Sequence, residues 1–381
     1  MSRVLLIGEV DSIWTFKCIE KTGLFDDNSI YLYDPFPNTE TKKYKDLGVK
    51  IIDDCHLRHT DRKNKIRTLK YVTNYVSCIK MLSKKHNSFD VVHINYASME
   101  KILSIPYLRK ISKKLVVTFW GSDLFRVSDF ILKRYKAYFD KVDVITLSTN
   151  EMVSRFHDVY GDRYDSKLQR IRFGVDGFNY IDLLNPSENS KSFFDLPLDK
   201  TIITIGYNGN VAQQHLKVID ELRLLPDNLQ KKIFIIIPAT YGLNDEYKQN
   251  LIDSLDELVC DYRIFDRFMS DEELGQLRNA TDYFIHSQIT DALSASVQEY
   301  LYARKIVFNP TWIVYEDFDE VGVYYEKYGS FIELRQLLAN QIETGINRET
   351  ESNLNKNSEI LSNLTSWNVV SSKWRELYSE L

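Results

Sequence analysis

The sequence predicts an α/β protein with two domains of similar size, each built on a parallel sheet. Three observations carry this prediction. Short runs rich in β-branched and aromatic residues alternate with segments of helical spacing, which is typical of βαβ units. The alternation stops at a polar segment with two prolines, residues 182–200, and then starts again. A chain of 381 residues with 44% hydrophobic side chains is also long enough to bury two cores.

The predicted strands follow one another along both halves of the chain. In the first half they are the runs 3–8, 29–34, 49–53, 89–95, 114–120 and 143–148, and the clearest helical spacing lies at 67–85. In the second half they are the runs 201–209, 232–239, 262–268, 282–288 and 305–310. We therefore assign residues 1–181 to a first domain, 182–200 to a linker and 201–365 to a second domain.

Composition excludes several classes of protein. No apolar run approaches the ~20 residues that span a bilayer, and the apolar stretch at the first residues is too short for a secretory signal. We therefore expect a cytoplasmic protein. The four cysteines (Cys18, Cys55, Cys78 and Cys260) show no paired spacing and no clustered histidines, so we expect neither a disulfide framework nor a zinc site.

The charge is distributed unevenly. Residues 1–180 carry 31 Lys and Arg against 22 Asp and Glu, whereas the rest of the chain carries 18 against 32. No nucleic-acid-binding motif accompanies this charge, so nucleic acid is not an expected partner. Solvated helix faces are one explanation of the basic clusters, and contact with an anionic membrane surface is the other. The clusters lie at 41–45, 62–67, 80–85 and 109–114.

In open α/β sheets, ligands bind beyond the carboxyl ends of the strands, so the residues after each strand are candidates for the site. Gly8 stands alone after the first strand, which counts against a dinucleotide fingerprint. Gly121, Ser122 and Asp123 follow the run 114–120. The glycine permits close approach of a ligand, and the two polar side chains can hydrogen-bond it. The alternative is that Ser122 or Asp123 only caps the next helix.

A second polar loop follows the first strand of the second domain. It contains Gly206, Asn208, Gly209 and Asn210. A flexible loop rich in amides suits phosphate groups or sugar hydroxyls. An ordinary Asn-Gly turn explains the same residues equally well.

Asp291 and Glu299 bracket a run of mostly small residues that leads into a predicted helix. If the helix begins within 293–296, its free N–H groups and positive dipole end favour a phosphate. Asp291 would bind hydroxyls on the far side of that phosphate, and Glu299 would lean back toward it. This layout fits a nucleotide sugar. The alternative is a capping box from Ser296 to Glu299, in which Glu299 only satisfies its own helix.

The segment 268–307 resembles the second-domain signature of GT-B glycosyltransferases, particularly family four. Further matches are FDVVHIN, TFWGSD in place of the common T-x-H-G-x-D, IRFGVD and SWNVVSSKWRELY, so the resemblance covers nearly the whole chain. It implies two Rossmann-like domains whose parallel sheets face a central cleft. It also implies a C-terminal helix, residues 366–381, that crosses back to the first domain.

The resemblance assigns roles to individual residues. The family's acid that contacts the donor sugar falls on Asp291, and the acid that holds the ribose falls on Glu299. The phosphate-binding amides fall on Leu293, Ser294 and Ala295. The implied activity is transfer of a sugar from a nucleotide-sugar donor, without a metal or other cofactor.

Two departures from the family pattern matter. The first acid is Asp291 rather than Glu, which shortens its reach. The loop 206–215 also lacks the Arg and Lys that usually neutralise the donor pyrophosphate. Asn208 stands near the Arg position, and the Lys position is near Gln213, Gln214 or His215. Candidates for the missing positive charge are Arg172, Lys217 and Arg267.

The sequence offers three candidates for a catalytic base and one possible metal motif. Asp123, Glu9 or His93 would activate an acceptor hydroxyl if the reaction inverts configuration, and no base is needed if it retains configuration. The single D-x-D, Asp317 to Asp319, comes too late in the chain for a metal motif, and an exposed acidic loop explains it.

Three functions are open on this basis. The leading one is a hexosyltransferase-type glycosyltransferase that extends a lipid-linked glycan acceptor in cell-surface polysaccharide biosynthesis, on the inner face of the cell membrane as a peripheral protein. The second is a GT-B-fold sugar-nucleotide epimerase. The third is a catalytically silent relative that binds a glycan or a partner.

Overall fold

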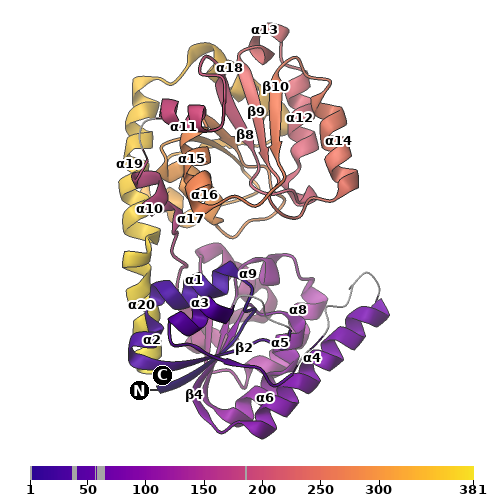
Figure 1. Cartoon of the computed structure of the whole chain (residues 1–381), viewed down its shortest axis with the longest axis vertical. Coiled ribbons are helices and arrows are strands. Elements are labelled where there is room, and N and C mark those ends of the chain that lie inside the picture. Colours follow the sequence, from indigo (N-terminus) through magenta and orange to yellow (C-terminus); the bar gives the residue numbers. More distant parts are fainter. Residues whose placement is uncertain (1, 37–40, 56, 58–64, 185–186) are drawn as a thin grey trace. The chain divides into compact units, whose positions relative to one another are not determined.

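The computed structural model describes residues 2–36, 41–55, 57, 65–184 and 187–381, and these form two compact units. One unit comprises Met1–Gly174 with Trp367–Leu381, and the other comprises Val175–Ser366. Each unit is a parallel sheet covered by helices on both faces (Figure 1). The prediction of two α/β domains with parallel sheets is confirmed.

The first sheet, within the described residues, has seven parallel strands in the order β3-β2-β1-β4-β5-β6-β7. The strand order switches direction between β1 and β4, so the ligand edge of this sheet lies beyond those two strands. The sequence did not predict β7, which is short and mostly polar. The strands are β1 Ser2–Ile7, β2 Asn28–Tyr33, β3 Lys50–Ile52, β4 Phe89–Asn95, β5 Ser112–Thr118, β6 Val144–Leu147 and β7 Leu168–Arg170.

The second sheet, again within the described residues, has six parallel strands in the order β10-β9-β8-β11-β12-β13. Its switch point lies between β8 and β11. The sequence did not predict β13, another three-residue edge strand. The strands are β8 Thr201–Ile205, β9 Ile233–Pro238, β10 Asp261–Phe265, β11 Tyr283–Ile285, β12 Ile306–Pro310 and β13 Glu326–Tyr328.

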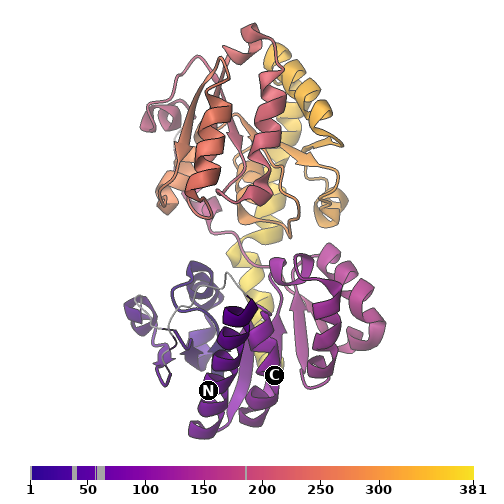
Figure 2. The same cartoon turned by 90° about the vertical axis from the view of Figure 1, so that its right-hand side faces the viewer.

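Helices cover both faces of the first sheet. α1 and α20 pack together on one face, and α4 lies on the other beside α5 and α6 (Figures 1 and 2). The helices are α1 Ile13–Thr22, α2 Leu24–Asp27, α3 Thr41–Asp46, α4 Lys65–Lys85, α5 Met99–Leu103, α6 Ile105–Leu108, η1 Arg109–Ile111, α7 Ser122–Phe125, α8 Asp129–Phe139, α9 Asn150–Tyr160, η2 Gly161–Lys167 and α20 Trp367–Glu380.

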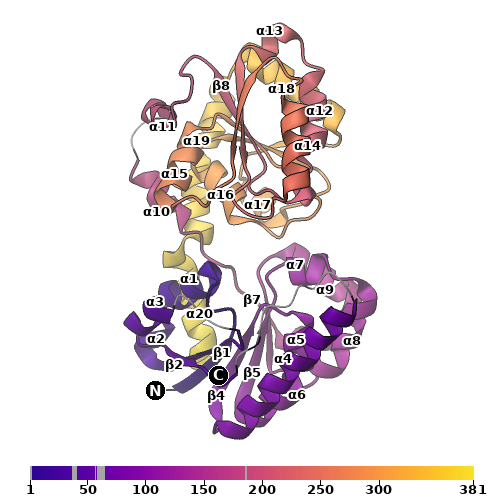
Figure 3. The same cartoon turned by 45° about the vertical axis from the view of Figure 1, so that its right-hand side comes forward.

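The second sheet is covered in the same way. α12 and α14 lie on one face, with α18 packed beside α12, and α15, α16 and α19 lie on the other (Figures 1 and 3). The helices are α10 Gly177–Asp182, α11 Ser187–Phe193, η3 Val211–Gln213, α12 His215–Arg223, α13 Asp227–Gln230, α14 Asp245–Leu255, α15 Asp271–Ala280, α16 Ala295–Tyr302, α17 Glu316–Val321, α18 Phe331–Thr344 and α19 Arg348–Thr365.

The last helix, α20, completes the core of the first domain. Trp374 is fully buried there, and its Nε1 donates a hydrogen bond to the carbonyl of Arg172 at 2.9 Å. The hydroxyl of Tyr378 lies 2.5 Å from Nδ1 of His93 on β4. The C-terminal helix therefore does return to the first domain, as the resemblance implied.

The boundary between the units lies at Gly174, rather than after residue 181. Residues 177–182 form α10, which packs against α15 and α16, and Phe178 stacks on Tyr302 with ring centroids 4.0 Å apart. The segment 182–200, predicted as a linker, contains α11, which also packs against α15.

The expectation of no disulfide is wrong. Cys55, which follows β3, is bonded to Cys78 on α4. The two cysteines are 23 residues apart in the sequence and have no motif spacing, so only the fold brings them together. Cys18 and Cys260 are free and buried.

Candidate functional site

α16 begins at Ala295, within the region predicted for its start. Ser294 is the N-cap residue, and its hydroxyl accepts a hydrogen bond from the N–H of Val297 at 3.3 Å. Leu293 has a φ of 69°, a left-handed conformation that is unusual for a leucine. The capping-box interpretation of Ser296 and Glu299 is wrong, because the cap is formed two residues earlier than that pattern requires. The α15 cap, by contrast, is a capping box from Ser270 to Glu273.

Asp291 binds the start of this helix directly. Its carboxylate accepts hydrogen bonds from the N–H of Ser294 at 2.9 Å, from the hydroxyl of Tyr315 at 2.5 Å and from the hydroxyl of Tyr207 at 3.4 Å. A negative charge therefore already lies at the positive end of the α16 dipole. Of the three amides expected to bind phosphate, the one of Ser294 is occupied by this side chain.

Glu299 lies in a buried ion pair that the sequence did not reveal. Nε of Arg278, on α15, donates a hydrogen bond to Oε2 of Glu299 at 3.0 Å, and the side chains of Arg278 and Glu299 are 3% and 12% exposed. Arg278 also donates to the hydroxyls of Tyr300 and Ser296, at 3.0 and 3.1 Å. The two residues of the pair are 21 positions apart, so no local motif connects them.

The Glu299 carboxylate also lies against the backbone of α10. A Cβ added to Gly177 would meet Oε1 of Glu299 at 2.4 Å, so a larger residue there would displace this side chain. In this arrangement Glu299 neutralises an arginine and supports the packing of three helices. Binding of a ribose by the same carboxylate would be additional to this structural role.

The loop after β8 is held by its own side chains. Oδ1 of Asn208 accepts from the N–H of Asn210 at 2.9 Å, and Oδ1 of Asn210 accepts from the N–H of Ala212 at the same distance. Gly206 has a φ of 66°, and a Cβ there would lie 2.7 Å from Nε2 of His215. Both asparagines thus shape the turn, as in the alternative that the sequence left open.

The segment 213–215, near the position where the resemblance predicts a Lys, carries an uncharged network. Gln213 donates to Gln288, and Nε2 of Gln214 donates to the carbonyl of Ser287 at 2.6 Å. Burial lowers the pKa of His215 to about 4, so this imidazole is neutral at physiological pH. At these three positions the loop therefore carries amide groups and a neutral imidazole instead of a positive charge.

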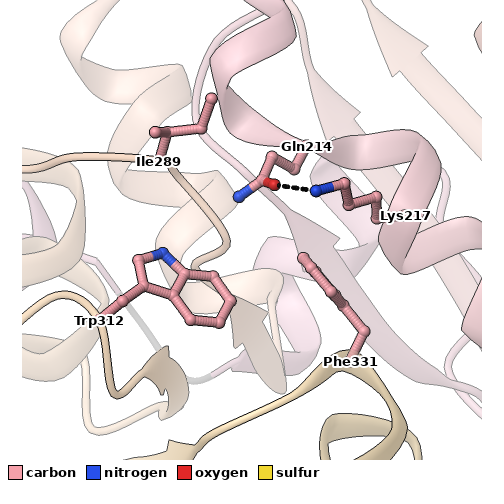
Figure 4. Close-up of a pocket in the computed structure, with 5 residues that line it drawn as sticks. All are labelled: Gln214, Lys217, Ile289, Trp312 and Phe331. Carbon is pink, nitrogen blue, oxygen red and sulfur yellow. Dashed lines mark hydrogen bonds between the residues drawn. The ribbon is translucent and has the colours of Figure 1, made fainter.

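The three candidates for the missing charge lie in different surroundings. Lys217 is one turn into α12, and its Nζ donates to Oε1 of Gln214 at 2.7 Å (Figure 4). Arg267 is paired with Glu273, on the exposed first turn of α15. Arg172 belongs to the first unit. Among these three, only Lys217 lies on the element that directly follows the β8 loop.

In the first domain, Asp123 connects two loops at the carboxyl edge of the sheet. One of its oxygens accepts from the N–H groups of Trp120 and Gly121, both at 2.9 Å, and the other accepts from the N–H of Ala97 at 2.7 Å. Gly121 has a φ of 117°, and the hydroxyl of Ser122 lies 3.1 Å from that of Tyr96. Burial raises the pKa of Asp123 to about 6. These hydrogen bonds occupy both carboxylate oxygens, so Asp123 holds the two loops together in this structure.

The other two candidate bases differ in exposure. His93 is buried between Tyr378 and Thr118, with Nε2 2.6 Å from the Thr118 hydroxyl, and burial lowers its pKa to about 3. A histidine in this environment does not accept a proton near neutral pH. Glu9 is exposed just beyond β1 and remains a candidate.

The D-x-D pair lies on α17. Asp319 forms an ion pair with Lys327 at 2.8 Å and accepts from the Tyr325 hydroxyl, while Asp317 is buried. Within the described part of the chain, no group of three His, Cys, Asp or Glu side chains is arranged to hold a metal ion.

Comparison with known proteins identifies the fold. No family model and no curated protein matches the sequence, but solved structures match along the whole chain. A glycosyltransferase from Rickettsia africae superposes with a TM-score of 0.74 at 16% identity, covering 100% of this chain and 98% of that one. Sucrose-phosphate synthase from Thermosynechococcus elongatus gives 0.76 at 12% identity, covering 100% and 99%. HepE of Anabaena, solved with UDP-glucose, gives 0.73 at 15% identity, with both chains fully covered. The chain has the GT-B fold.

In this GT-B fold, each domain gathers part of the predicted site at the carboxyl edge of its own sheet. The second domain brings together the loop of Gly206 to Asn210, Asp291 and the start of α16, through contacts among Tyr207, Asp291 and Ser294. The first domain brings together Gly121, Ser122 and Asp123 with the loop after β4. Arg278 is the residue of this region that sequence reasoning missed.

Proposed function

We propose that the protein transfers a sugar from a nucleotide-sugar donor to a glycan acceptor. The observation that carries the proposal is the match of the whole chain to structures described as a glycosyltransferase, as sucrose-phosphate synthase and as HepE with UDP-glucose. The polar groups at the edge of the second sheet are consistent with it. In that domain the start of α16 would stabilise the leaving nucleoside diphosphate, because its amides and dipole favour negative charge.

The position of Asp291 adds a step to donor binding. Its carboxylate holds the N–H of Ser294, so it competes with a phosphate for the start of α16. When a donor binds, Asp291 would release this amide to the phosphate and turn to a hydroxyl of the sugar. Positioning of the two substrates then supplies much of the rate enhancement.

A thermal-shift screen with UDP-, GDP-, dTDP- and CMP-sugars tests the donor proposal. A ligand that binds only the folded state at 100 times its Kd stabilises that state by about 2.7 kcal/mol, so one nucleotide series is expected to raise Tm clearly. The variant Asp291→Asn should change this shift, because Asp291 takes part in donor binding, and Lys231→Gln, at an exposed position outside the site, is the matched control. If none of the four series changes Tm, the protein does not bind a nucleotide sugar and the proposal fails.

One observation favours a catalytically silent relative as the second candidate. The loop after β8 carries Gln213, Gln214 and a neutral His215 where a transferase of this type usually has cations. A silent relative would bind a glycan or a donor without turnover. An assay for free nucleoside diphosphate, run with and without acceptor glycans, separates the two functions. A transferase releases nucleoside diphosphate from the donor, and a silent relative does not.

We further propose that the acceptor is lipid-linked, in cell-surface polysaccharide biosynthesis, and that the first domain binds an anionic membrane from the cytoplasmic side. No helix in the described residues is long and apolar enough to span a bilayer. Two of the basic clusters, 80–85 and 109–114, lie close together. Nζ of Lys80 and Nζ of Lys110 lie 6.0 and 5.7 Å from the centroid of the Tyr107 ring. Lys43, in the first cluster, lies over the ring of Phe16 instead. Residues 62–64 of the remaining cluster lie outside the described residues.

Liposome cosedimentation tests this contact. Attraction between exposed lysines and anionic lipid is screened by salt, so we expect peripheral, salt-sensitive binding. The attraction is reduced where a lysine is already paired, as Lys113 is with Asp90. The protein should sediment with anionic liposomes at low ionic strength and dissociate at about 0.5 M salt, where the screening length is a few ångströms. The variant Lys80→Gln with Lys110→Gln should bind more weakly, and Lys231→Gln in the second domain is the control. Equal binding to neutral liposomes would show that the clusters are only solvated faces.

A further inference from the structure

A pocket of about 290 Å³ opens in the second domain, and neither Asp291 nor Glu299 is among the residues that line it (Figure 4). The residues around it follow four neighbouring strands of the sheet. Because the carboxyl ends of parallel strands meet at one edge, this is where an open α/β sheet places its ligands. The lining residues are Gln214 after β8, Ile289 after β11, Trp312 after β12 and Phe331 after β13, together with Lys217.

Two aromatic rings form the apolar side of the pocket. The rings of Trp312 and Phe331 have centroids 5.7 Å apart and are inclined by 52°, and both point toward the same space in Figure 4. Trp312 is fixed in this position, since its Nε1 donates to the carbonyl of Gln288 at 3.0 Å and its ring packs edge-on against Tyr328. It nevertheless remains 41% exposed. A rigid, half-open indole offers a flat apolar surface to a ligand ring.

The polar side of the pocket carries one positive charge. Nζ of Lys217 donates to Oε1 of Gln214 at 2.7 Å and lies 5.5 Å from the centroid of Phe331. Gln214 is itself held, because its Nε2 donates to the carbonyl of Ser287. An ammonium has three donors, and this bond uses one of them. None of the residues that line the pocket is acidic, so the pocket is suited to an anionic group.

We propose that this pocket is a subsite for an acidic sugar residue, a pyranose that carries a carboxylate. Such a ring has an apolar face of C–H groups to lie against Trp312 and a carboxylate to meet Lys217. Inorganic phosphate has no face for the indole, and a neutral hexose leaves the ammonium without an anion. The volume is slightly below the range of about 300–1,000 Å³ typical of drug-sized ligands, which fits one ring.

The subsite deepens the proposed function and rests on it for the choice of a sugar. Ile289 and Asp291 lie on the same loop, and Trp312 and Tyr315 lie on the next loop, where Tyr315 binds Asp291. A sugar in the pocket would therefore share both loops with the candidate donor site. This would make Trp312 and Lys217 determinants of sugar specificity.

Ligand-detected NMR titration of the full chain with D-glucuronate and D-glucose tests the inference. Glucuronate is expected to bind at least about tenfold more tightly, the factor that one charge-assisted hydrogen bond provides. Lys217→Met should abolish this preference, and Trp312→Ala should abolish binding of both sugars. Both side chains are partly exposed, and a Tm equal to that of the native chain verifies that the variants fold. Lys231→Met, outside the pocket, is the matched control.

Three results would overturn the inference: equal binding of the two sugars, glucuronate binding that survives both substitutions, or displacement of glucuronate by UDP alone, which would assign the pocket to the nucleotide. The thermal-shift screen with nucleotide sugars decides the proposed function separately. Specific glucuronate binding in a protein that responds to no nucleotide sugar would support the subsite and overturn the transferase.

Discussion

Replacing Arg278 by methionine is expected to destabilise the second domain by about 3–5 kcal/mol. The substitution leaves the Glu299 carboxylate buried against α10 without its cation, and an uncompensated buried charge has this cost. It also removes the donors to the hydroxyls of Tyr300 and Ser296. Urea unfolding followed by circular dichroism measures the loss.

Two further variants identify the cause. Arg278→Met combined with Glu299→Gln should recover part of the stability, since no charge remains unpaired. Arg267→Met removes an arginine from an exposed pair with Glu273 and should change stability little. If Arg278→Met is no worse than Arg267→Met, the buried pair does not support the domain. Glu299→Gln with near-native stability and weaker donor binding would instead assign the carboxylate to the ribose.

Acidification is expected to weaken the first domain, with His93 responsible for about 4–5 kcal/mol of the loss. Burial lowers the pKa of this histidine from 6.5 to about 3, so between these values the unfolded chain binds a proton that the folded chain does not. The contribution of His93 to the free energy of unfolding is therefore fully present above pH 6.5 and is lost as the pH drops toward 3. Tryptophan fluorescence can follow this transition, because Trp14, Trp120, Trp367 and Trp374 all belong to the first unit.

The variant His93→Gln should reduce the dependence of stability on pH in this range, whatever its stability at pH 7. Thr118→Val is the matched control, because it removes the partner of Nε2 without removing a titrating group. It should lower stability at every pH and leave the slope nearly unchanged. A wild-type slope in His93→Gln would show that other groups cause the acid sensitivity.

The fold was predictable because parallel strands that are buried on both faces appear in a single sequence as nearly continuous apolar runs. All of the predicted strands are present, since runs such as 89–95 and 232–239 are apolar enough to show their burial. β7 and β13 were missed because three residues at a sheet edge carry too little pattern. The disulfide and the boundary at Gly174 depend on contacts distant in sequence, which no local spacing records.

The site was predictable only in part, because many of its contacts join residues that are distant in the sequence. The start of α16 was located correctly because small residues and a serine cap are local signals. The partners of the two acids could not be predicted, because they are distant in the sequence. Asp291 binds tyrosines from two other loops, and Glu299 binds an arginine from another helix. Asp123 is one of three candidate bases on the sequence, and its hydrogen bonds to the N–H groups of two loops are not visible in the GSD motif itself.

The return of α20 to the first domain imposes an order on biosynthesis. Trp374, Leu377 and Tyr378 fill the core between β1, β4 and α1, yet they leave the ribosome after the whole of the second domain. Domains usually fold as they emerge, with the N-terminal one first. Here the second domain, residues 175–366, has its full set of strands before the first can close its apolar face. The first domain therefore stays partly open until α20 has been synthesised.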